Sequence, residues 1–273
     1  MKEIALVPRN LPSLLVMEVT VMNLPEQVKV YGGKDSRVNA VIVLGEKGTV
    51  VVDTHVTLED GQAVRQMAEQ ASGSRPILAV ALTHEHFDHI AGNQYFDCNI
   101  ISSQACRDEI MASREGLNRR IQGLTVTPPN IAYEGNLLFS LGDLTLEMRH
   151  EGGHCKGESS IFIPELSTLI AGDLVFHGRA PFVGAADFPQ WITALTRLYA
   201  MDPEIVIPGH GQPGTKNILL EQRTWLESFM DATLSCKRRG MSPDEACAHV
   251  LTTMNLPSER RDMFAVAVNR LFS

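Results

Sequence analysis

Residues 82–93, LTHEHFDHIAGN, gather three histidines and two acids in a segment with few bulky side chains. In an extended segment, His84 and His86 project from the same side because side chains alternate with a period of two, so both imidazoles can reach one metal ion. If a helix or tight turn begins near Asp88, then Asp88 and His89 turn away from the first pair and can hold a second ion. A solvated charged loop is the alternative, but it would not need four potential ligands at the end of an apolar strand. The spacing therefore predicts half of a two-metal hydrolytic site.

The residues before this motif predict the elements that position it. Residues 38–53, VNAVIVLGEKGTVVVD, consist of two β-rich runs joined by a Gly-containing turn and end at Asp53, which predicts a hairpin. Residues 58–72 have the apolar spacing of a helix. The almost wholly apolar run 76–82 predicts a buried strand that carries the motif at its C-terminal end.

The same order of elements recurs further along the chain. Residues 159–173, SSIFIPELSTLIAGD, again predict a hairpin that ends in an aspartate, Asp173. A helix predicted at 188–201 then leads into the short apolar strand 204–210, which ends at His210. Both halves run hairpin, aspartate, helix, strand and histidine. This order indicates an internal pseudo-repeat whose strand-end loops meet at a shared edge.

The segment between these halves and the segment after them also have sequence patterns that predict helices, strands and a loop. We expect a helix near 102–116, strands at 136–141 and 144–150, and a proline-rich surface loop at 122–130. Beyond the GHGQPG turn the chain is predicted to be mainly helical. There Ser242 is followed by Pro243 and, at the third helical position, Glu245, which predicts the start of a helix.

Composition and charge exclude several classes of partner. The 273-residue chain is long enough for one large domain or two small ones, and its 44% hydrophobic content can bury a sizeable core. The formal net charge is −8, and no Lys/Arg run is longer than KRR at 237–239, which argues against nucleic acid and favours a small-molecule substrate. The five cysteines are odd in number and form no CxxC pair, so we expect no disulfide framework.

The N-terminal residues 1–22 carry apolar side chains but are interrupted by Pro8, Arg9, Pro12 and Glu18. This pattern lacks the unbroken apolar stretch of a signal peptide and the ~20 apolar residues of a membrane span. We therefore expect a cytoplasmic protein without a membrane partner. A homo-oligomer is compatible with the composition.

The HxHxDH pattern at residues 84–89 resembles the signature of the metallo-β-lactamase-fold superfamily of metallohydrolases, and the resemblance extends over residues 38–215. The family pattern adds an early strand-end aspartate, a histidine in a Gly-rich turn, a later strand-end aspartate and a last histidine in a GH turn. The matching residues here are Asp53, His154 in EGGHCKGES, Asp173 in AGD and His210 in PGHG. Every position of the pattern is present and in order.

This resemblance implies a complete two-metal site. One ion would be held by His84, His86 and His154, the other by Asp88, His89 and His210, and Asp173 would span both. Asp53 would orient a ligand histidine or the loop that bears it. Two ions about 3.5–4 Å apart can share a water, lower its pKa toward 7 and polarise a substrate carbonyl. Zn²⁺ is the expected metal, and iron or manganese are alternatives.

The resemblance also implies the fold. We expect an α/β fold, a four-layer αββα sandwich of two mixed β-sheets flanked by helices, with a short C-terminal helical extension. Residues 1–214 would form the metallo-β-lactamase-like domain, and residues 215–273 would form the extension packed on it.

Other side chains are candidates for catalysis or substrate contact. Asp88 is a candidate catalytic carboxylate as well as a ligand. His177 and Arg179 follow the bridging aspartate and are candidates for substrate contact or for stabilising an oxyanion. His55 and Cys155 lie close in sequence to predicted site residues and are weaker candidates of the same kind. The loops 54–58, 122–130 and 176–188 are expected to set substrate choice.

The residues at a few single positions distinguish between the subclasses of hydrolase that this family contains. True metallo-β-lactamases typically have Cys or Ser where this chain has Asp173, whereas glyoxalase II-like thioesterases and acyl-homoserine lactonases share the bridging aspartate. Several such lactonases have a tyrosine where this chain has Phe176, which cannot donate a hydrogen bond. The C-terminal helices contain Lys237 and two arginines but no tyrosine after Tyr199, unlike the glutathione site of glyoxalase II.

The resulting hypothesis is a metal-dependent hydrolase in which a water bridged by two divalent metals cleaves a small ester, lactone, thioester or cyclic amide. The alternatives are β-lactamase activity, a metal-binding protein without catalysis, and an iron-dependent oxygenase of the same fold. Metal content separates them: two zinc ions per chain favour hydrolysis, one iron ion favours oxygenation, and none favours a relict site.

Overall fold

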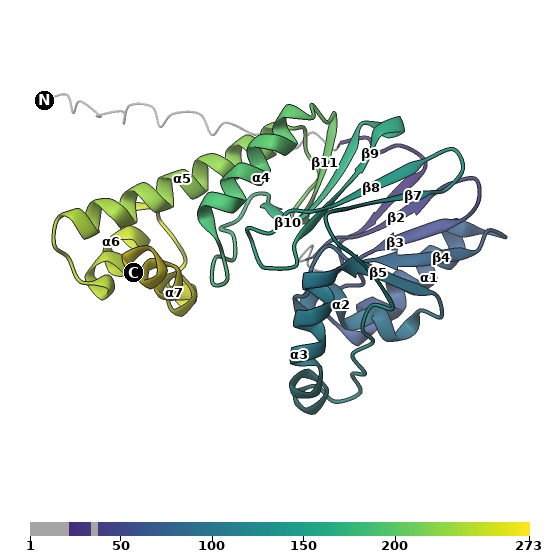
Figure 1. Ribbon diagram of the computed structural model, residues 1–273, viewed down its shortest axis with the longest axis horizontal. Coiled ribbons are helices and arrows are strands. Elements are labelled where there is room, and N and C mark those ends of the chain that lie inside the picture. Colours follow the sequence, from purple (N-terminus) through teal and green to yellow (C-terminus); the bar gives the residue numbers. More distant parts are fainter. Residues whose placement is uncertain (1–21, 34–37) are drawn as a thin grey trace, which may run out of the picture.

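The computed structural model describes residues 22–33 and 38–273 and shows two β-sheets packed face to face with helices on both outer sides (Figure 1). This confirms the predicted α/β fold. The prediction for residues 1–22 lies almost wholly outside the described residues. Among the described helices, none has the length and apolar character that crossing a bilayer requires.

The first sheet has six strands in the order β1-β2-β3-β4-β5-β6. Its strands are β1 Val28–Tyr31, β2 Ala40–Leu44, β3 Thr49–Val52, β4 Ile77–Ala81, β5 Asn99–Ser103 and β6 Ile131–Tyr133. Its connections contain α1 Leu58–Ser72, α2 Phe87–Ile90, the 3₁₀ helix η1 Ala91–Tyr95 and α3 Gln104–Arg120. The β1–β2–β3 pairs are antiparallel, and β3 to β6 pair in parallel.

The second sheet has five strands in the order β11-β10-β9-β8-β7. Its strands are β7 Asn136–Ser140, β8 Thr145–His150, β9 Ser159–Ile163, β10 Thr168–Phe176 and β11 Ile205–His210. The helical elements of this half are η2 Pro164–Leu166, α4 Phe188–Ala200, α5 Asn217–Arg238, α6 Pro243–Thr253, η3 Ser258–Arg260 and α7 Arg261–Phe272. Within this sheet β10 and β11 pair in parallel and the other pairs are antiparallel, so both sheets are mixed.

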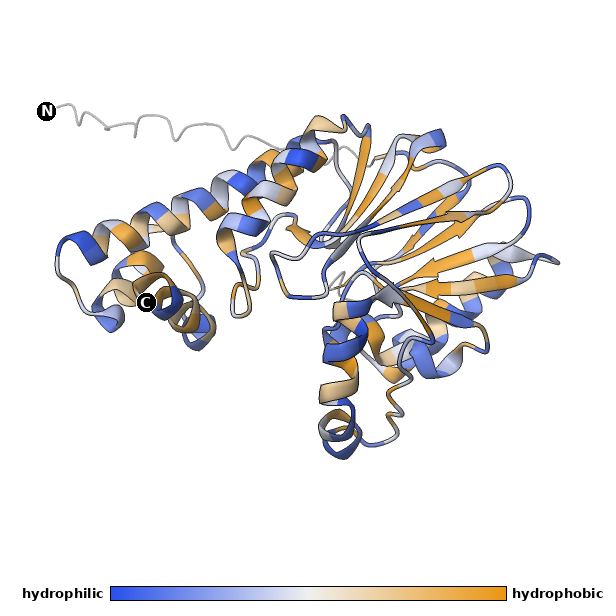
Figure 2. Ribbon diagram, viewed as in Figure 1, coloured by the Kyte–Doolittle hydropathy of each residue, from blue (hydrophilic) through white to orange (hydrophobic). Residues whose placement is uncertain are grey.

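Alternation along the strands builds three apolar interfaces between the four layers. In β2, Val41 and Val43 face the second sheet, whereas Ala40 and Ile42 belong to the cluster under α1 and α3. Because successive side chains of a strand point to opposite faces, a wholly apolar strand such as β2 must be covered on both sides. Figure 2 shows the resulting distribution, with hydrophobic strands inside and hydrophilic residues on the outer faces of the helices.

The predicted pseudo-repeat is confirmed. The β2–β3 hairpin is followed by α1 and by β4, which pairs in parallel with β3. The β9–β10 hairpin is followed by α4 and by β11, which pairs in parallel with β10. The helices begin where capping residues stand: Thr57 accepts from Asp60 N–H at α1, and Asp187 accepts from Gln190 N–H at α4.

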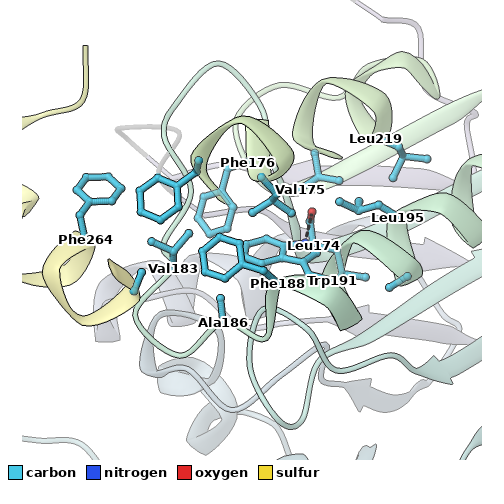
Figure 3. Packing of buried hydrophobic residues seen from close by; sticks show 14 of the residues in the cluster. Leu174, Val175, Phe176, Val183, Ala186, Phe188, Trp191, Leu195, Leu219 and Phe264 are labelled. Carbon is cyan, nitrogen blue, oxygen red and sulfur yellow. Dashed lines mark hydrogen bonds between the residues drawn. The ribbon is translucent and has the colours of Figure 1, made fainter. Parts of the chain in front are cut away.

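The C-terminal helices continue the core of the second half. Trp191 of α4 is fully buried, and its indole N–H donates to the Leu174 carbonyl at 3.0 Å. The cluster around it runs from β10 to Phe264 of α7 without a break (Figure 3). The predicted capping box at Ser242 and Glu245 is present at the start of α6.

Several boundaries differ from the predictions. Strand β10 does not end at Asp173 but continues to Phe176, because the residues on both sides of the aspartate are apolar and buried. Helix α3 runs from Gln104 to Arg120, and the short strands β1, β5 and β6 are not among the predicted elements. The loop 122–130 is not purely superficial, since Leu124 and Val126 are only 6% and 2% exposed.

Candidate metal centre

The predicted metal ligands come together at the edge where strands of both sheets end. His84 and His86 follow β4, and α2 begins directly after His86, which turns the following pair of ligands as predicted. Backbone hydrogen bonds join the two halves at this edge. Ser159 N–H donates to the Thr83 carbonyl at 2.8 Å, and Asn39 N–H donates to the Gly209 carbonyl at 2.8 Å.

The side chains form two groups. The first contains His84, His86, His154 and Asp173, and the second contains Asp88, His89 and His210. Within each group, one potential ligand atom from each residue lies within 4.8 Å of all the others. The structure thus brings together all seven residues that the sequence predicts as ligands.

Asp173 connects the two groups through its two carboxylate oxygens. Oδ1 lies 3.3 Å from His89 Nε2 and 3.3 Å from His210 Nε2. Oδ2 lies 3.4 Å from His154 Nε2 and 3.7 Å from His84 Nε2. One oxygen therefore faces each group, which is the geometry that a carboxylate shared by two cations requires.

Buried polar atoms test whether cations fit these groups. Among the described residues, His84 Nε2, His89 Nε2 and Asp173 Oδ1 are buried without a hydrogen-bond partner. Buried polar atoms are rarely left without a partner, because desolvation without compensation costs about 1–3 kcal/mol each. Imidazole nitrogens and carboxylate oxygens are also the donor set that Zn²⁺ prefers. The residues present therefore fit a pair of divalent cations.

The protonation of the histidines differs between the groups. Burial lowers the pKa of His154 to about 3, so its imidazole is neutral. At His210 burial also lowers the pKa, but the Asp173 carboxylate outweighs it and the pKa is raised to about 9. Since a cation binds neutral imidazole, it must displace a proton from His210 at neutral pH.

Asp53 positions the HxHxDH motif through hydrogen bonds, as predicted. Its Oδ1 accepts from Thr83 N–H at 2.8 Å, and its Oδ2 accepts from Thr83 Oγ1 at 2.7 Å. The same Oδ2 lies 2.8 Å from His89 Nδ1, which leaves His89 Nε2 to face Asp173. Asp53 thus orients both a predicted ligand and the loop that bears the motif.

Two glycines allow the backbone to approach the carboxylates of Asp173 and Glu158 closely. A Cβ at Gly209 would collide with Asp173 Oδ1, and a Cβ at Gly172 would collide with Glu158 Oε1. Gly172 also has a φ of +54°, a conformation that glycine adopts at little cost. The glycines of the AGD and PGH turns therefore allow the carboxylates to come this close.

Glu158 is a buried residue of the site that the sequence reasoning missed. Its Oε1 accepts from Asp173 N–H at 3.2 Å, and its Oε2 lies 3.6 Å from His84 Nδ1. Burial and the nearby Asp173 carboxylate raise its pKa well above the usual range. An acid directly before a buried strand, four residues after His154, is the signal that could have identified it.

Removal of the Glu158 side chain, which accepts a hydrogen bond from Asp173 N–H, is expected to weaken metal binding. Glu158→Ala leaves the Asp173 N–H without its acceptor and should reduce metal affinity by about 10–100-fold. Glu158→Gln keeps an acceptor oxygen for the Asp173 N–H, so its affinity should stay close to that of the original chain. Competition of each variant with a chromogenic chelator measures the affinities, and equal losses in both variants would contradict this role.

A cavity of about 660 Å³ opens over the two groups. Its floor includes His86, Asp88, Asp173 and His210. Its apolar wall consists of Val38, Val56, Phe87, Phe176, Phe182 and Met263. The Phe176 ring stacks on the His210 imidazole, with centroids 4.8 Å apart and an interplanar angle of 7°. The cavity thus presents the candidate metal ligands to an apolar ligand-binding space.

The candidates for catalysis or substrate contact lie in different environments. Arg179 lines the cavity. His177 is not among the lining residues, and its Nδ1 lies 2.6 Å from the Gln212 carbonyl. His55 packs against the Tyr31 ring and is 2% exposed, while Cys155 is buried and donates to Glu85 Oε2 at 3.3 Å. Catalytic roles for these residues stay predictions.

The cavity wall also shows which segments the sequence reasoning missed. The predicted substrate loops 54–58 and 176–188 contribute lining residues, but the loop 122–130 contributes none. In its place, the C-terminal segment 259–263 lines the cavity with Glu259, Arg260, Asp262 and Met263. No local sequence pattern indicates that this segment folds back over the site.

Comparisons of the sequence with known proteins find relatives of this chain. A family model described as the metallo-β-lactamase superfamily matches residues 33–210. Acyl-coenzyme A thioesterase MBLAC2 from Gallus gallus is 29% identical over 203 residues, which cover 64% of this chain and 73% of the relative. The probable metallo-hydrolase YqgX of Bacillus subtilis is 28% identical over 174 residues, which cover 60% of this chain and 80% of the relative.

Solved structures share the fold. A metallo-β-lactamase family protein from Thermus thermophilus superposes with a TM-score of 0.68 at 16% identity and covers 91% of this chain and 92% of its own. A metallo-β-lactamase from Pontibacter korlensis superposes with a TM-score of 0.62 at 21% identity, over 76% of this chain and 98% of its own.

Proposed function

Because the chain belongs to the metallo-β-lactamase superfamily of metal-dependent hydrolases, we propose that it uses two zinc ions to cleave a small ester, lactone, thioester or cyclic amide. The observation that carries this proposal is the position of Asp173, whose two oxygens face two separate groups of potential ligands. A protein of this fold that has lost catalysis would be expected to lack a metal ligand, whereas this chain has all seven predicted ligands.

The chain's own residues supply the positions for hydrolysis. Two cations bound here would supply Lewis-acid activation of a water molecule and of a substrate carbonyl. Asp173 and the histidines fix where that chemistry takes place, and Asp53 and Glu158 hold them in place from behind. Phe176 and Phe182 shield the site with apolar surface, which strengthens electrostatic interactions within it.

Within this range of substrates, an acyl thioester has the best support. The curated relative from Gallus gallus is named as an acyl-coenzyme A thioesterase. The apolar wall of the 660 Å³ cavity offers a matching surface for an acyl chain. The aspartate at 173, where the resemblance leads us to expect Cys or Ser in a true β-lactamase, argues against β-lactam hydrolysis as the main activity.

A substrate panel tests the proposal. The zinc-loaded chain is assayed with nitrocefin, an acyl lactone, S-lactoylglutathione and an acyl-coenzyme A, and the Asp173→Asn protein provides the background rate. We expect thioester turnover that depends on Asp173 and about two zinc ions per chain by elemental analysis. One iron ion per chain in the protein as purified, together with no hydrolysis of any of the four compounds by the zinc-loaded chain, would overturn the proposal in favour of the oxygenase alternative.

The C-terminal helices belong to the same proposal. We treat residues 215–273 as an extension packed on the domain formed by residues 1–214. The hydrophobic cluster that continues from β10 through α5 to α7 supports the packing of this extension on the domain.

A further inference from the structure

The metal-facing cavity is continued by a second, outer cavity of about 350 Å³. The two cavities share Arg179, Glu259 and Arg260 as lining residues. The rest of the outer wall comes from Ala180, from Trp225 of α5 and from residues 254–257 between α6 and η3. Most of this outer wall therefore lies beyond residue 210, where the match to the family model ends.

The boundary between the two cavities carries positive charge. Among the charged side chains that line the outer cavity, two are arginines, Arg179 and Arg260, and one is an acid, Glu259, which leaves one excess positive charge. This sign is the opposite of the chain's formal net charge of −8. Three further acids line only the inner cavity: Asp88 and Asp173 face the candidate metal positions, and Asp262 lies two residues after Arg260 in the chain. The excess of arginine over acid is therefore a property of the outer cavity and not of the inner one.

Arg260 is held in place at this boundary. Its Nη1 donates to the Ala180 carbonyl at 3.3 Å, which ties η3 to the loop that follows β10. A guanidinium carries five N–H donors in a planar fork, so this bond uses one donor and leaves others for a ligand. This fork matches the oxygens of phosphate or carboxylate groups.

From this arrangement we infer that Arg260, together with Arg179, forms an anion subsite for the phosphorylated part of a thiol leaving group. The acyl part of the same substrate lies against Phe176 and Phe182, with the thioester carbonyl over Asp173. The inference rests on the proposed thioester hydrolysis and adds the residues that distinguish a charged leaving group from a neutral one.

A matched pair of substrates tests the subsite. The same acyl group is presented as a thioester of coenzyme A, which is phosphorylated, and of N-acetylcysteamine, which is neutral. The zinc-loaded full chain should have the higher kcat/KM for the coenzyme A thioester. Arg260→Ala should lower the ratio of the two kcat/KM values by about tenfold, mainly through KM, because a hydrogen bond to a charged group is lost.

Arg270 provides a matched control on α7. Its Nη1 donates to the Ala186 carbonyl at 3.3 Å, so it also ties the C-terminal helices to the loop after β10, but it lines neither cavity. Arg270→Ala should therefore keep the ratio of the original chain. If both variants lower the ratio equally, or if the original chain does not discriminate between the two thioesters, the inference is wrong.

Binding of free coenzyme A separates this inference from the proposed function. Calorimetry with the zinc-loaded chain should show binding that weakens about tenfold in Arg260→Ala and not in Arg270→Ala. If neither thioester is hydrolysed but this binding pattern holds, the proposed thioester hydrolysis fails and the anion subsite stands. If hydrolysis is found without any contribution of Arg260 to binding or to the ratio, the subsite fails and the proposed function stands.

Discussion

Asp173→Asn is expected to reduce kcat/KM for the best substrate by at least about a thousandfold and to lower the metal content of the chain at both positions. Asp173 Oδ1 lies 3.3 Å from His89 Nε2, and Oδ2 lies 3.4 Å from His154 Nε2, so the carboxylate serves both groups. An asparagine offers one acceptor oxygen and an amide that donates, and therefore cannot face two cations. Elemental analysis and steady-state kinetics of the purified variant measure both effects.

Asp231→Asn is the matched control for this change. Asp231 is an exposed residue of α5 that lines neither cavity, and its replacement alters the same functional group. It should keep two ions per chain and the original kcat/KM. An Asp173→Asn protein that retained both would show that Asp173 is not a shared ligand.

His86→Ala is expected to abolish turnover and release metal from the first group while the chain stays folded. The Nδ1 atom of His86 lies 3.1 Å from His154 Nε2, where both would contact the same ion. His86 is only partly buried, in contrast to His84, which is 0% exposed. Its loss should therefore change the free energy of unfolding of the metal-free chain by no more than about 1 kcal/mol. Circular dichroism, thermal unfolding and metal analysis measure these effects.

His249→Ala serves as the control, since His249 is an exposed residue of α6. It should leave activity and metal content at their original values. Retained activity in His86→Ala would refute the assignment of the first group as a metal site.

The features that could be predicted from the sequence are those with a local physical cause. The helix at 58–72 is predictable from the sequence because its apolar spacing coincides with the capping Thr57. His84 and His210 could be placed at a shared edge because each lies at the end of a buried strand in one of two similar halves. The alternation of side chains along a strand and the tendency of loops at strand ends to carry functional residues were enough to predict the positions of these histidines.

The features that could not be predicted depend on contacts between distant segments. Arg260 reaches the cavity because its side chain bonds to the Ala180 carbonyl, far away in the sequence, and such packing leaves no local pattern. Glu158 likewise acts through Asp173 N–H, a contact between neighbouring strands whose register is set by the whole sheet. His177 directly follows Phe176, but its Nδ1 lies against the Gln212 carbonyl and it does not line the cavity.

The division of the ligand groups between the two halves of the chain has a consequence for biosynthesis. His84 and His86 emerge from the ribosome early, but the first group stays incomplete until Asp173 has been made, and the second group stays incomplete until His210 has been made. Because domains generally begin to fold from the N-terminus during synthesis, the first sheet can assemble before either ion has a complete coordination shell. The cations are therefore expected to bind late, after both halves have assembled, and to stabilise the contact between them. A prematurely terminated chain would lack this stabilisation.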